Sequence, residues 1–547
     1  MQREILSVQE WSRAFLSYAA GGIFMIISLN FCFFTSTGKL FVRQIKKEIR
    51  DCLKEINWRS FTQPFLLMSG VYLLGILTII RANFLYLDDI PRTIEGNRGW
   101  YGWSRYVAEI FSVFMHADSH LTDISPLPQL LAILFLAIGS VILVYVLTNK
   151  KITIIALIAS IPIGLSPYML ECLSYKYDAP YMALSVLAGI IPFLFLARKR
   201  AFVFCSVISL LIMCMTYQAA SGIYLMITLF LCFNDWNGKR KTNREVFLFL
   251  GQATLSFCIT MLIFRLFLMK PTDTYVSTSI LPVQQMISGT LTNLQTYIIT
   301  VNFDFGFIWK VIIGIIFFFF ITKSFRSSQQ NKMISLLVTV LFLCLLLLLS
   351  YGVYSVLARP LFQPRALYGI GIFLAIISIY IVSNFNKLAK IAALALSWSF
   401  FVFAFSYGNA WADQMRYANF RIGILLHDLS VLFPDKDKDE NEITIQLKNG
   451  IGYTPFVKNT AKHNPIIYKL GFQMMQEDDI FFTQYSLEYF NFFPRGTVNR
   501  ERILKSGERL PYIDFNTLNL PVVLKTYYHT IKSDGKRVLV ELNEGVK

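Results

Sequence analysis

Long apolar blocks separated by short polar segments occupy most of the chain, and this pattern predicts its secondary structure. Each block holds about 17 to 25 residues with almost no charge, the length of a helix that crosses a bilayer core. Such blocks predict eleven spanning helices, near residues 64–81, 128–147, 152–168, 179–197, 202–217, 219–234, 246–268, 306–322, 333–356, 367–384 and 389–406. The pattern therefore indicates an α-helical polytopic membrane protein.

Two apolar stretches depart from the simple pattern. Residues 15–35 are interrupted by glycine, serine and asparagine, and a basic amphipathic stretch follows at 39–59. A twelfth span, a helix lying in the interface and an uncleaved signal-like segment all fit this block, and we expect the span. The run 202–234 is polar at its middle, from Thr216 to Ser221, which predicts a tight helical hairpin with a polar turn on the outer surface.

The composition changes after residue 406, where charged and aromatic residues replace the apolar blocks. Alternating positions at 522–528 and 537–541 flank a turn at Ser533, Asp534 and Gly535, a pattern typical of a β-hairpin. We expect three regions: an N-terminal apolar segment with a basic cytoplasmic stretch at 1–63, a transmembrane domain of eleven or twelve helices at 64–406, and a small extracytoplasmic α+β domain at 407–547.

Composition supports this assignment and excludes two broad classes. Of the 547 residues, 55% are hydrophobic and only 16% are charged, and the mean hydropathy is +0.52. Soluble proteins carry roughly 25% charged residues, so a soluble enzyme and a disordered scaffold are both excluded. The net charge of +17 does not indicate nucleic acid as a partner, because residues 406–547 hold 18 basic and 17 acidic residues and the surplus lies in the membrane part.

The basic residues of the membrane part predict its orientation. If the first span runs outward, the loops at 39–63, 149–151, 198–200, 234–245, 323–332 and 384–390 are cytoplasmic and carry 21 Lys and Arg, against 7 in the loops of the other side. Positive loops stay in the cytoplasm. The loops at 82–127, 169–180, 269–305 and 357–366, together with the C-terminal domain, are therefore expected outside it.

The first outer loop carries the candidate base. Asp88 and Asp89 follow a predicted span by a few residues, so they lie at the membrane interface. Partial desolvation there raises the pKa of a carboxylate and makes it a better base. A solvated helix cap or turn at the membrane boundary explains the same pair equally well.

The loops outside the cytoplasm are expected to hold few basic residues, so the arginines and the lysine found in them call for an explanation. Lys176 and Asp178 lie in the second outer loop, and Arg359 and Arg365 lie in the fourth. An anionic partner at the membrane surface supplies the reason, because a guanidinium group binds phosphate through paired, charge-assisted hydrogen bonds. Contact with lipid head groups, or an ion pair with Asp178 or Glu171, is the alternative.

Other chemistries lack support in the sequence. No Walker-type loop, dinucleotide-binding fingerprint or nucleophile elbow occurs, and the eight cysteines show no metal-ligand spacing. Only His116 and His120 share a helical face, and two ligands do not make a zinc site. No cofactor is therefore expected, although paired carboxylates and an anionic leaving group are compatible with a divalent cation.

Four outer segments together resemble a known enzyme class. An Asp-Asp pair just after an early span, followed by Trp103 and Arg105, resembles the GT-C class of integral-membrane glycosyltransferases. More narrowly, the resemblance is to the phage-borne O-antigen glucosyltransferases that change bacterial serotype. It covers approximately residues 64–410 and rests on Tyr86-Leu-Asp-Asp-Ile-Pro-Arg92, Leu173-Ser-Tyr-Lys-Tyr-Asp178, Thr216-Tyr-Gln218 and Arg359-Pro-Leu-Phe-Gln-Pro-Arg365.

The resemblance implies a GT-C-like catalytic domain at 64–406 in the bacterial inner membrane, with its active site and C-terminal domain periplasmic. It implies an inverting transfer of glucose from undecaprenyl-phosphate-glucose to a sugar of the lipid-linked O-antigen. Asp88 or Asp89 would act as the base while the other orients it, and Asp178 would bind a sugar hydroxyl or position a cation. The substrate-binding candidates are Arg92, Trp103, Arg105, Lys176, Asp178, Gln218, Arg359 and Arg365.

Two other functions fit the same residues. A GT-C transferase that modifies lipid A or a protein keeps the chemistry and changes the acceptor. A flippase or transporter of a polyprenyl-linked sugar would use the arginines to bind phosphate without reaction. Transporters of that kind show internal repeats and charged residues at mid-membrane, and neither is clear in this chain, so we expect the enzyme.

Overall fold

The computed structural model describes residues 36–272, 276–383, 386–434, 443–471, 474–477, 480–490, 492, 502–503, 509–510 and 514–544. The predicted block at 15–35 lies outside these residues. All eleven predicted spans coincide with helical segments. Seven helices within the described residues are long and apolar enough to cross a membrane: α3 (Arg59–Ala82), α6 (Leu127–Leu147), α12 (Ser221–Asn237), α13 (Asn243–Ile263), α15 (Phe307–Ser327), α16 (Lys332–Leu349) and α18 (Lys387–Leu432).

The predicted span at 152–168 is broken into three short helices. They are α7 (Ile154–Ala159), α8 (Pro162–Leu165) and α9 (Pro167–Ser174), and the chain bends by 57° between Leu165 and Pro167. Ser166 is extended because a residue before proline is disfavoured in the helical region. If the two bent segments Ile154–Leu165 and Pro167–Ser174 are counted as one span, the number of membrane-crossing helices in the described residues rises to eight.

Three further predicted spans coincide with helices that are too short to be counted among the seven long helices: α10 (Ala179–Ile190, continued by the 3₁₀ turn Ile191–Phe195), α11 (Lys199–Cys214) and α17 (Gly369–Val382). Almost every residue of α10 and α17 is buried inside the protein. Their apolar composition therefore serves the protein core rather than the lipid. Hydropathy alone does not separate these two environments, which is why the sequence predicted eleven or twelve spans of full length.

The predicted hairpin at 202–234 is present, but its polar turn is not on the outer surface. Helix α11 ends at Cys214 and α12 begins at Ser221. Thr216 and Tyr217 between them are each only 1% exposed. The carbonyl of Met215 accepts hydrogen bonds from the backbone of the first outer loop. That loop therefore covers the turn, which becomes part of the interior.

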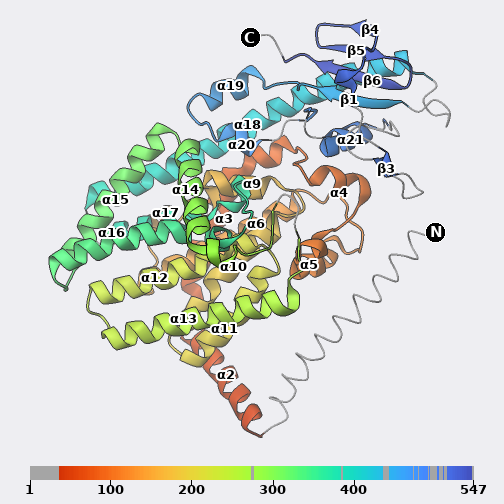
Figure 1. The fold of residues 1–547 in the computed structure, drawn as a ribbon. Coiled ribbons are helices and arrows are strands. Elements are labelled where there is room, and N and C mark those ends of the chain that lie inside the picture. The colour runs from red at the N-terminus through yellow and green to blue at the C-terminus, as the bar shows by residue number, and fades with distance from the viewer. Residues whose placement is uncertain are drawn as a thin grey trace.

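The C-terminal region is built on the far end of α18. This 46-residue helix passes through the predicted domain boundary at residue 407 without a break and joins the helical body to a four-stranded sheet (Figure 1). The strands are β1 (Thr444–Lys448), β4 (Val522–Lys525), β5 (His529–Ser533) and β6 (Arg537–Leu542), in the order β1-β6-β5-β4. Strands β1 and β6 are parallel and the other two pairs antiparallel.

The turn predicted at Ser533, Asp534 and Gly535 joins β5 to β6. The strand expected at 522–528 ends at Lys525, and Thr526 then receives the backbone N–H groups of Tyr528 and His529 on its hydroxyl oxygen. The local side-chain bonds turn the chain there, so the predicted strand is shortened to β4, and the strand that leads into the turn is β5 rather than 522–528. The small helices α19 (Pro455–Ala461), α20 (Ile467–Leu470) and α21 (Ile480–Tyr489) complete the region.

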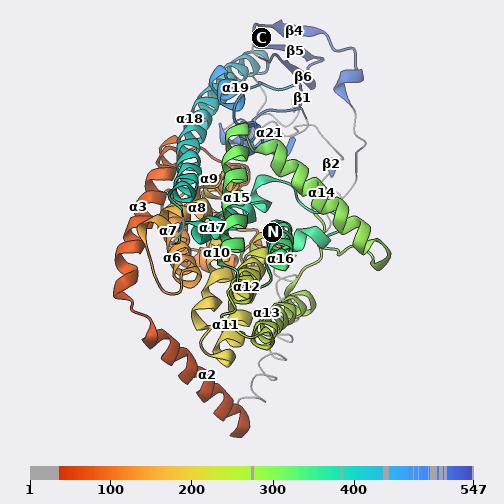
Figure 2. The same ribbon diagram turned by 90° about the vertical axis from the view of Figure 1, so that its left-hand side faces the viewer.

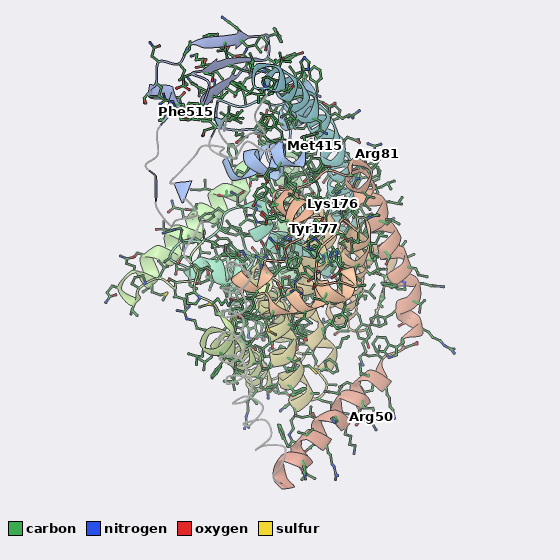
Figure 3. The ribbon with its side chains drawn as sticks, turned by 90° about the vertical axis from the view of Figure 1, so that its right-hand side faces the viewer. Arg50, Arg81, Lys176, Tyr177, Met415 and Phe515 are labelled. Carbon is green, nitrogen blue, oxygen red and sulfur yellow. The ribbon has the colours of Figure 1, made fainter. Side chains whose placement is uncertain are left out.

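Loops predicted to lie on opposite sides of the membrane are found at opposite ends of the molecule (Figures 1 and 2). At one end lies α2 (Ser36–Glu55), where Glu55 pairs with Arg198 at 3.3 Å. The sheet lies at the other end, with the predicted outer loops below it. Figure 3 shows Lys176 and Tyr177 between Met415 of α18 and the rest of the helical body, far from Arg50 of α2. This separation matches the predicted division of loops into two sides.

Candidate active site

Asp89 lies at the start of α4 (Asp89–Glu95), the short helix that follows α3 in the first outer loop. Its side chain is fully buried. The carboxylate accepts backbone hydrogen bonds from Tyr86 at 3.0 Å, from Lys176 at 3.0 and 3.1 Å and from Tyr177 at 3.4 Å. Asp89 therefore joins the first outer loop to the second one. Burial raises the pKa of Asp89 to about 7, while these bonds and the charges of Arg92 and Lys176 lower it.

Asp88 has the opposite surroundings. It is exposed, and its carboxylate makes no side-chain hydrogen bond to any part of the chain that the structure describes. It lies one helical turn from Arg92, whose backbone N–H donates to the carbonyl of Asp88 at 3.3 Å. Of the adjacent pair, only Asp88 presents a carboxylate that a substrate can reach.

Asp178 holds two arginines of the first outer loop. It is 3% exposed, and its carboxylate pairs with Arg92, accepts the indole N–H of Trp100 at 2.5 Å and lies 3.9 Å from Arg105. The guanidinium carbon of Arg92 lies 4.3 Å from the centre of the Trp100 ring. The Asp178 carboxylate therefore contacts two guanidinium groups of the first outer loop.

Glu171 forms a buried ion pair with Arg365, as Asp178 does with Arg92. This carboxylate is 1% exposed and accepts both the backbone N–H of Arg365 and its guanidinium group, the latter at 3.1 Å. The hydroxyl of Tyr86 also donates to it at 3.2 Å. An ion pair with Asp178 or Glu171 was an alternative explanation for the outer basic residues, and the structure contains it for Arg365, which pairs with Glu171. Asp178 pairs instead with Arg92 and Arg105 of the first outer loop. Each pair fixes the position of a guanidinium group.

Arg105 and Arg365 border a largely apolar cavity of about 350 Å³. Its walls include Phe257, Met261 and Leu361, while Trp103 and Gln218 lie near the arginines on the lining. Tyr217 lines it as well, with its ring centre 4.6 Å from the guanidinium carbon of Arg105. The Nε atom of Arg105 is buried without a hydrogen-bond partner among the described residues. The cavity thus combines an apolar interior with a cationic, hydrogen-bonding end.

Of the remaining predicted residues, Lys176 and Arg359 do not line this cavity, whereas Gln218 does. Lys176 is 4% exposed and pairs with Asp123 at 2.8 Å. Arg359 is exposed, and its carbonyl accepts the backbone N–H of Ser277 at 3.1 Å. Gln218 donates its amide to the carbonyls of Cys214 and Trp103, at 2.8 and 3.4 Å. Gln218 therefore ties the buried turn to the first outer loop while it lines the cavity.

Sequence reasoning missed the part played by two aromatic residues. Trp100 is fully buried, and its indole N–H donates to Asp178. Tyr217 lies in the polar segment Thr216–Ser221, but its contact with Arg105 was not predicted. A pairing of aromatic ring and arginine between distant segments leaves no local signal.

The C-terminal region packs directly on the first outer loop, next to Asp88 and Asp89. Ile90, the residue after Asp89, belongs to a buried cluster with α18 residues such as Ala418 and Ile422. The hydroxyl of Tyr485 on α21 donates to Glu95 at 2.6 Å, and that of Tyr86 donates to the carbonyl of Leu470 at 2.5 Å. Both sides of the Asp88–Asp89 segment are therefore fixed by the domain that follows the membrane part.

Metal ligands do not gather at the site: within the described ranges, no group of three or more His, Cys, Asp or Glu side chains is placed to hold an ion. The buried carboxylates are instead bonded to backbone amides, guanidinium groups, hydroxyls or an indole. The charges that the site offers to a ligand are those of Asp88 and the arginines.

Comparison with known proteins adds two similarities. The family model described as Glucosyl transferase GtrII matches residues 77–376, which include both aspartates, Asp178 and Arg365. The chain is also 29% identical over 181 residues to an "Uncharacterized 55.3 kDa protein in gtrB 5'region" of Salmonella phage P22. That match covers 33% of this chain and 36% of the phage protein, so the chain spans about a third of the relative's length. No solved structure matches.

Proposed function

We propose, from the premise that this chain belongs to the glucosyl transferase GtrII family, that it transfers glucose from undecaprenyl-phosphate-glucose to a sugar of the lipid-linked O-antigen. The reaction takes place at the periplasmic face of the bacterial inner membrane, and the product modifies the O-antigen and so the serotype. The observation that carries the proposal is the exposed carboxylate of Asp88 on the same outer loop as Arg105, which borders an apolar cavity.

The cavity fits a lipid-linked donor. A polyprenyl phosphate sugar has an apolar chain, an anionic phosphate and a polar sugar, and the cavity has an apolar interior with Arg105 and Arg365 at its border. Nucleotide sugars are absent outside the cytoplasm, so a donor used there arrives on a lipid. Guanidinium groups bind phosphate oxygens through two N–H donors, and the buried Nε of Arg105 has no hydrogen-bond partner among the described residues.

The reaction is a single displacement at the anomeric carbon. The acceptor hydroxyl oxygen attacks this carbon on the face opposite the phosphate, its proton passes to the Asp88 carboxylate, and the bond from carbon to phosphate oxygen breaks. Undecaprenyl phosphate leaves with the bonding electrons, and Arg105 and Arg365 stabilise the added negative charge. Attack opposite to departure inverts the configuration. Asp89 does not touch substrate; it holds the backbone that carries Asp88.

The distribution of these groups supports an enzyme over a flippase. The first outer loop, the segment Glu171–Asp178 and the fourth outer loop meet through ion pairs at one end of the helical body. A transporter needs its charged site near the middle of the membrane, reachable from both sides. Here the charged groups gather next to the C-terminal domain.

Reconstitution of the purified full-length chain tests the proposal. Liposomes receive undecaprenyl-phosphate-glucose labelled in the sugar, together with lipid-linked O-antigen, lipid A or a protein extract as separate acceptors. We expect label in the O-antigen alone, with inverted configuration by NMR. Label in another acceptor would replace the proposed substrate, and lipid movement across the bilayer without transfer would favour the flippase.

Asp88→Asn is the matched test of the base, and Asp118→Asn is its control. Both aspartates are exposed in the first outer loop, but the Asp118 carboxylate accepts the backbone N–H of His120 in a turn, whereas the Asp88 carboxylate accepts no hydrogen bond from the described residues. Transfer should be lost in the first variant and kept in the second. Equal activity of both would overturn the assignment of Asp88.

A further inference from the structure

A second cavity, of about 240 Å³, lies beside the segment that binds Asp89. Lys176, whose backbone N–H donates to both oxygens of Asp89, lines it with its side chain, and Ser174 lines it two residues earlier. The other walls come from the end of α3, the residues just after it and the start of α6. It shares no lining residue with the apolar cavity of Arg105 and Arg365.

Gln129 gives this cavity an unmet hydrogen-bonding group. The side chain is 3% exposed, and its Oε1 atom is buried without a hydrogen-bond partner among the described residues. Buried polar atoms are nearly always paired with protein or water, because an unpaired one costs free energy. A carbonyl oxygen can only accept, so its partner has to be an N–H or O–H group of something in the cavity.

The charge of the cavity is balanced. Lys176 is 4% exposed, and its ammonium group pairs with Asp123 at 2.8 Å. Its charge is therefore already compensated by a carboxylate. A neutral ligand with hydroxyl groups fits this site better than a phosphate does.

The lining is half polar and half apolar, and it is small. Ile79 and Phe84 are nearly buried and contribute hydrocarbon surface, while Gln129, Ser174 and the exposed Asn83 contribute polar atoms. A sugar ring has C–H groups on its faces and hydroxyls at its edge, which matches both kinds of wall. Liquid water occupies about 30 Å³ per molecule, so the cavity holds roughly eight waters, enough space for one monosaccharide unit and too little for a chain.

We infer that this cavity is the subsite for the acceptor sugar, a neutral monosaccharide unit recognised through the Gln129 amide. The inference rests on the proposed function for the identity of its ligand. Segment Glu171–Asp178 then serves both substrates: Glu171 and Asp178 hold the arginines at the donor cavity, whereas Ser174 and Lys176 line the acceptor subsite. Asp89 bonds the backbone of this segment to the loop that carries Asp88.

Direct binding tests the inference without any donor. Saturation-transfer difference NMR on the full-length protein in detergent uses the methyl glycosides of glucose, galactose, rhamnose and N-acetylglucosamine as probes. We expect a signal for at least one of them, its loss in Gln129→Leu and its retention in Gln129→Glu, which keeps an acceptor oxygen. Gln285→Leu, at an exposed glutamine outside both cavities, is the control. A cavity that holds only water gives no signal with any probe, which overturns the inference.

Kinetics separates the two substrates. Gln129→Leu should raise the KM for the acceptor at least tenfold with an unchanged KM for the donor, and Gln218→Leu, at the donor cavity, should do the reverse. An unchanged acceptor KM in a folded Gln129→Leu variant rejects the subsite and leaves the transferase intact. Sugar binding by a wild-type protein that transfers nothing from the lipid donor rejects the proposed function and leaves the subsite.

Discussion

Two regions of the site bury carboxylates, and they do so in different ways. At the start of α4, the carboxylate of Asp89 is bonded to three backbone N–H groups from two outer loops. In the segment Glu171–Asp178, the carboxylates of Glu171 and Asp178 are bonded mainly to arginine side chains. The first arrangement fixes the path of the backbone, and the second fixes the position of positive charge.

The difference explains why adjacent aspartates are not equivalent. Because Asp89 turns inward to the backbone amides, Asp88 next to it faces outward, with a rigid backbone on its C-terminal side. The arginines in turn gain fixed positions from buried carboxylates without losing all of their N–H donors. One region therefore fixes the backbone beside an exposed carboxylate, and the other fixes guanidinium groups at the border of the apolar cavity.

The largest expected effect separates the two aspartates. Asp88→Asn should lower the transfer rate about 10²–10⁴-fold, the usual contribution of a general base, with no change in melting temperature. Asp89→Asn should lower the melting temperature, because an amide NH₂ then faces backbone N–H groups. Transfer assays and thermal unfolding in detergent measure both. Full activity in Asp88→Asn, together with a stable but inactive Asp89→Asn, would reverse the roles.

Asp178→Asn should have the next largest effect. It leaves Arg92 without its buried partner, and removal of one member of a buried ion pair costs about 3–5 kcal/mol. We expect a lower melting temperature and a raised KM for the donor. Glu171→Gln should cost less, since the amide oxygen still accepts the backbone N–H of Arg365. Equal stability of the two variants and wild type would show that the arginines are held by other groups.

The pH dependence of stability should reveal Asp89. Its pKa is raised to about 7 in the folded chain, so the folded state binds the proton more tightly than the unfolded one. The contribution to the free energy of unfolding is then greatest at low pH and falls as the pH rises from about 4, the usual value for Asp, to about 7. The melting temperature of the wild type should fall with rising pH across this window, and that of Asp89→Asn should fall less. An identical pH dependence of the two proteins would contradict the raised pKa of Asp89.

The smallest expected effect concerns the C-terminal domain. Tyr485→Phe removes the hydrogen bond to Glu95 on α4, at a cost of about 1 kcal/mol, and should lower the transfer rate severalfold. Tyr489→Phe, on the same helix but 49% exposed, is the control. Kinetics of the two variants side by side measures the difference. Loss of activity in Tyr489→Phe alone would place the contact elsewhere on α21.

The outline of the fold follows from sequence because hydropathy is a local property. Apolar runs located every membrane helix among the described residues, and the charge bias grouped the outer loops that meet at the site. The same reasoning did not separate lipid-facing from buried apolar helices, as α10 and α17 show. It also placed the turn at Thr216 on the surface, because the loop that covers the turn comes from a segment about a hundred residues earlier.

The sequence by itself determined that carboxylates and arginines lie on one side of a helical membrane protein. Only the tertiary structure decided which aspartate is buried and which arginine pairs with which acid. Arg92 and Asp178 are 86 residues apart, and Arg365 and Glu171 are 194 apart. Residue pattern encodes interactions within a few turns of chain, whereas these ion pairs exist because packing of distant helices brings their ends together in a place that excludes water.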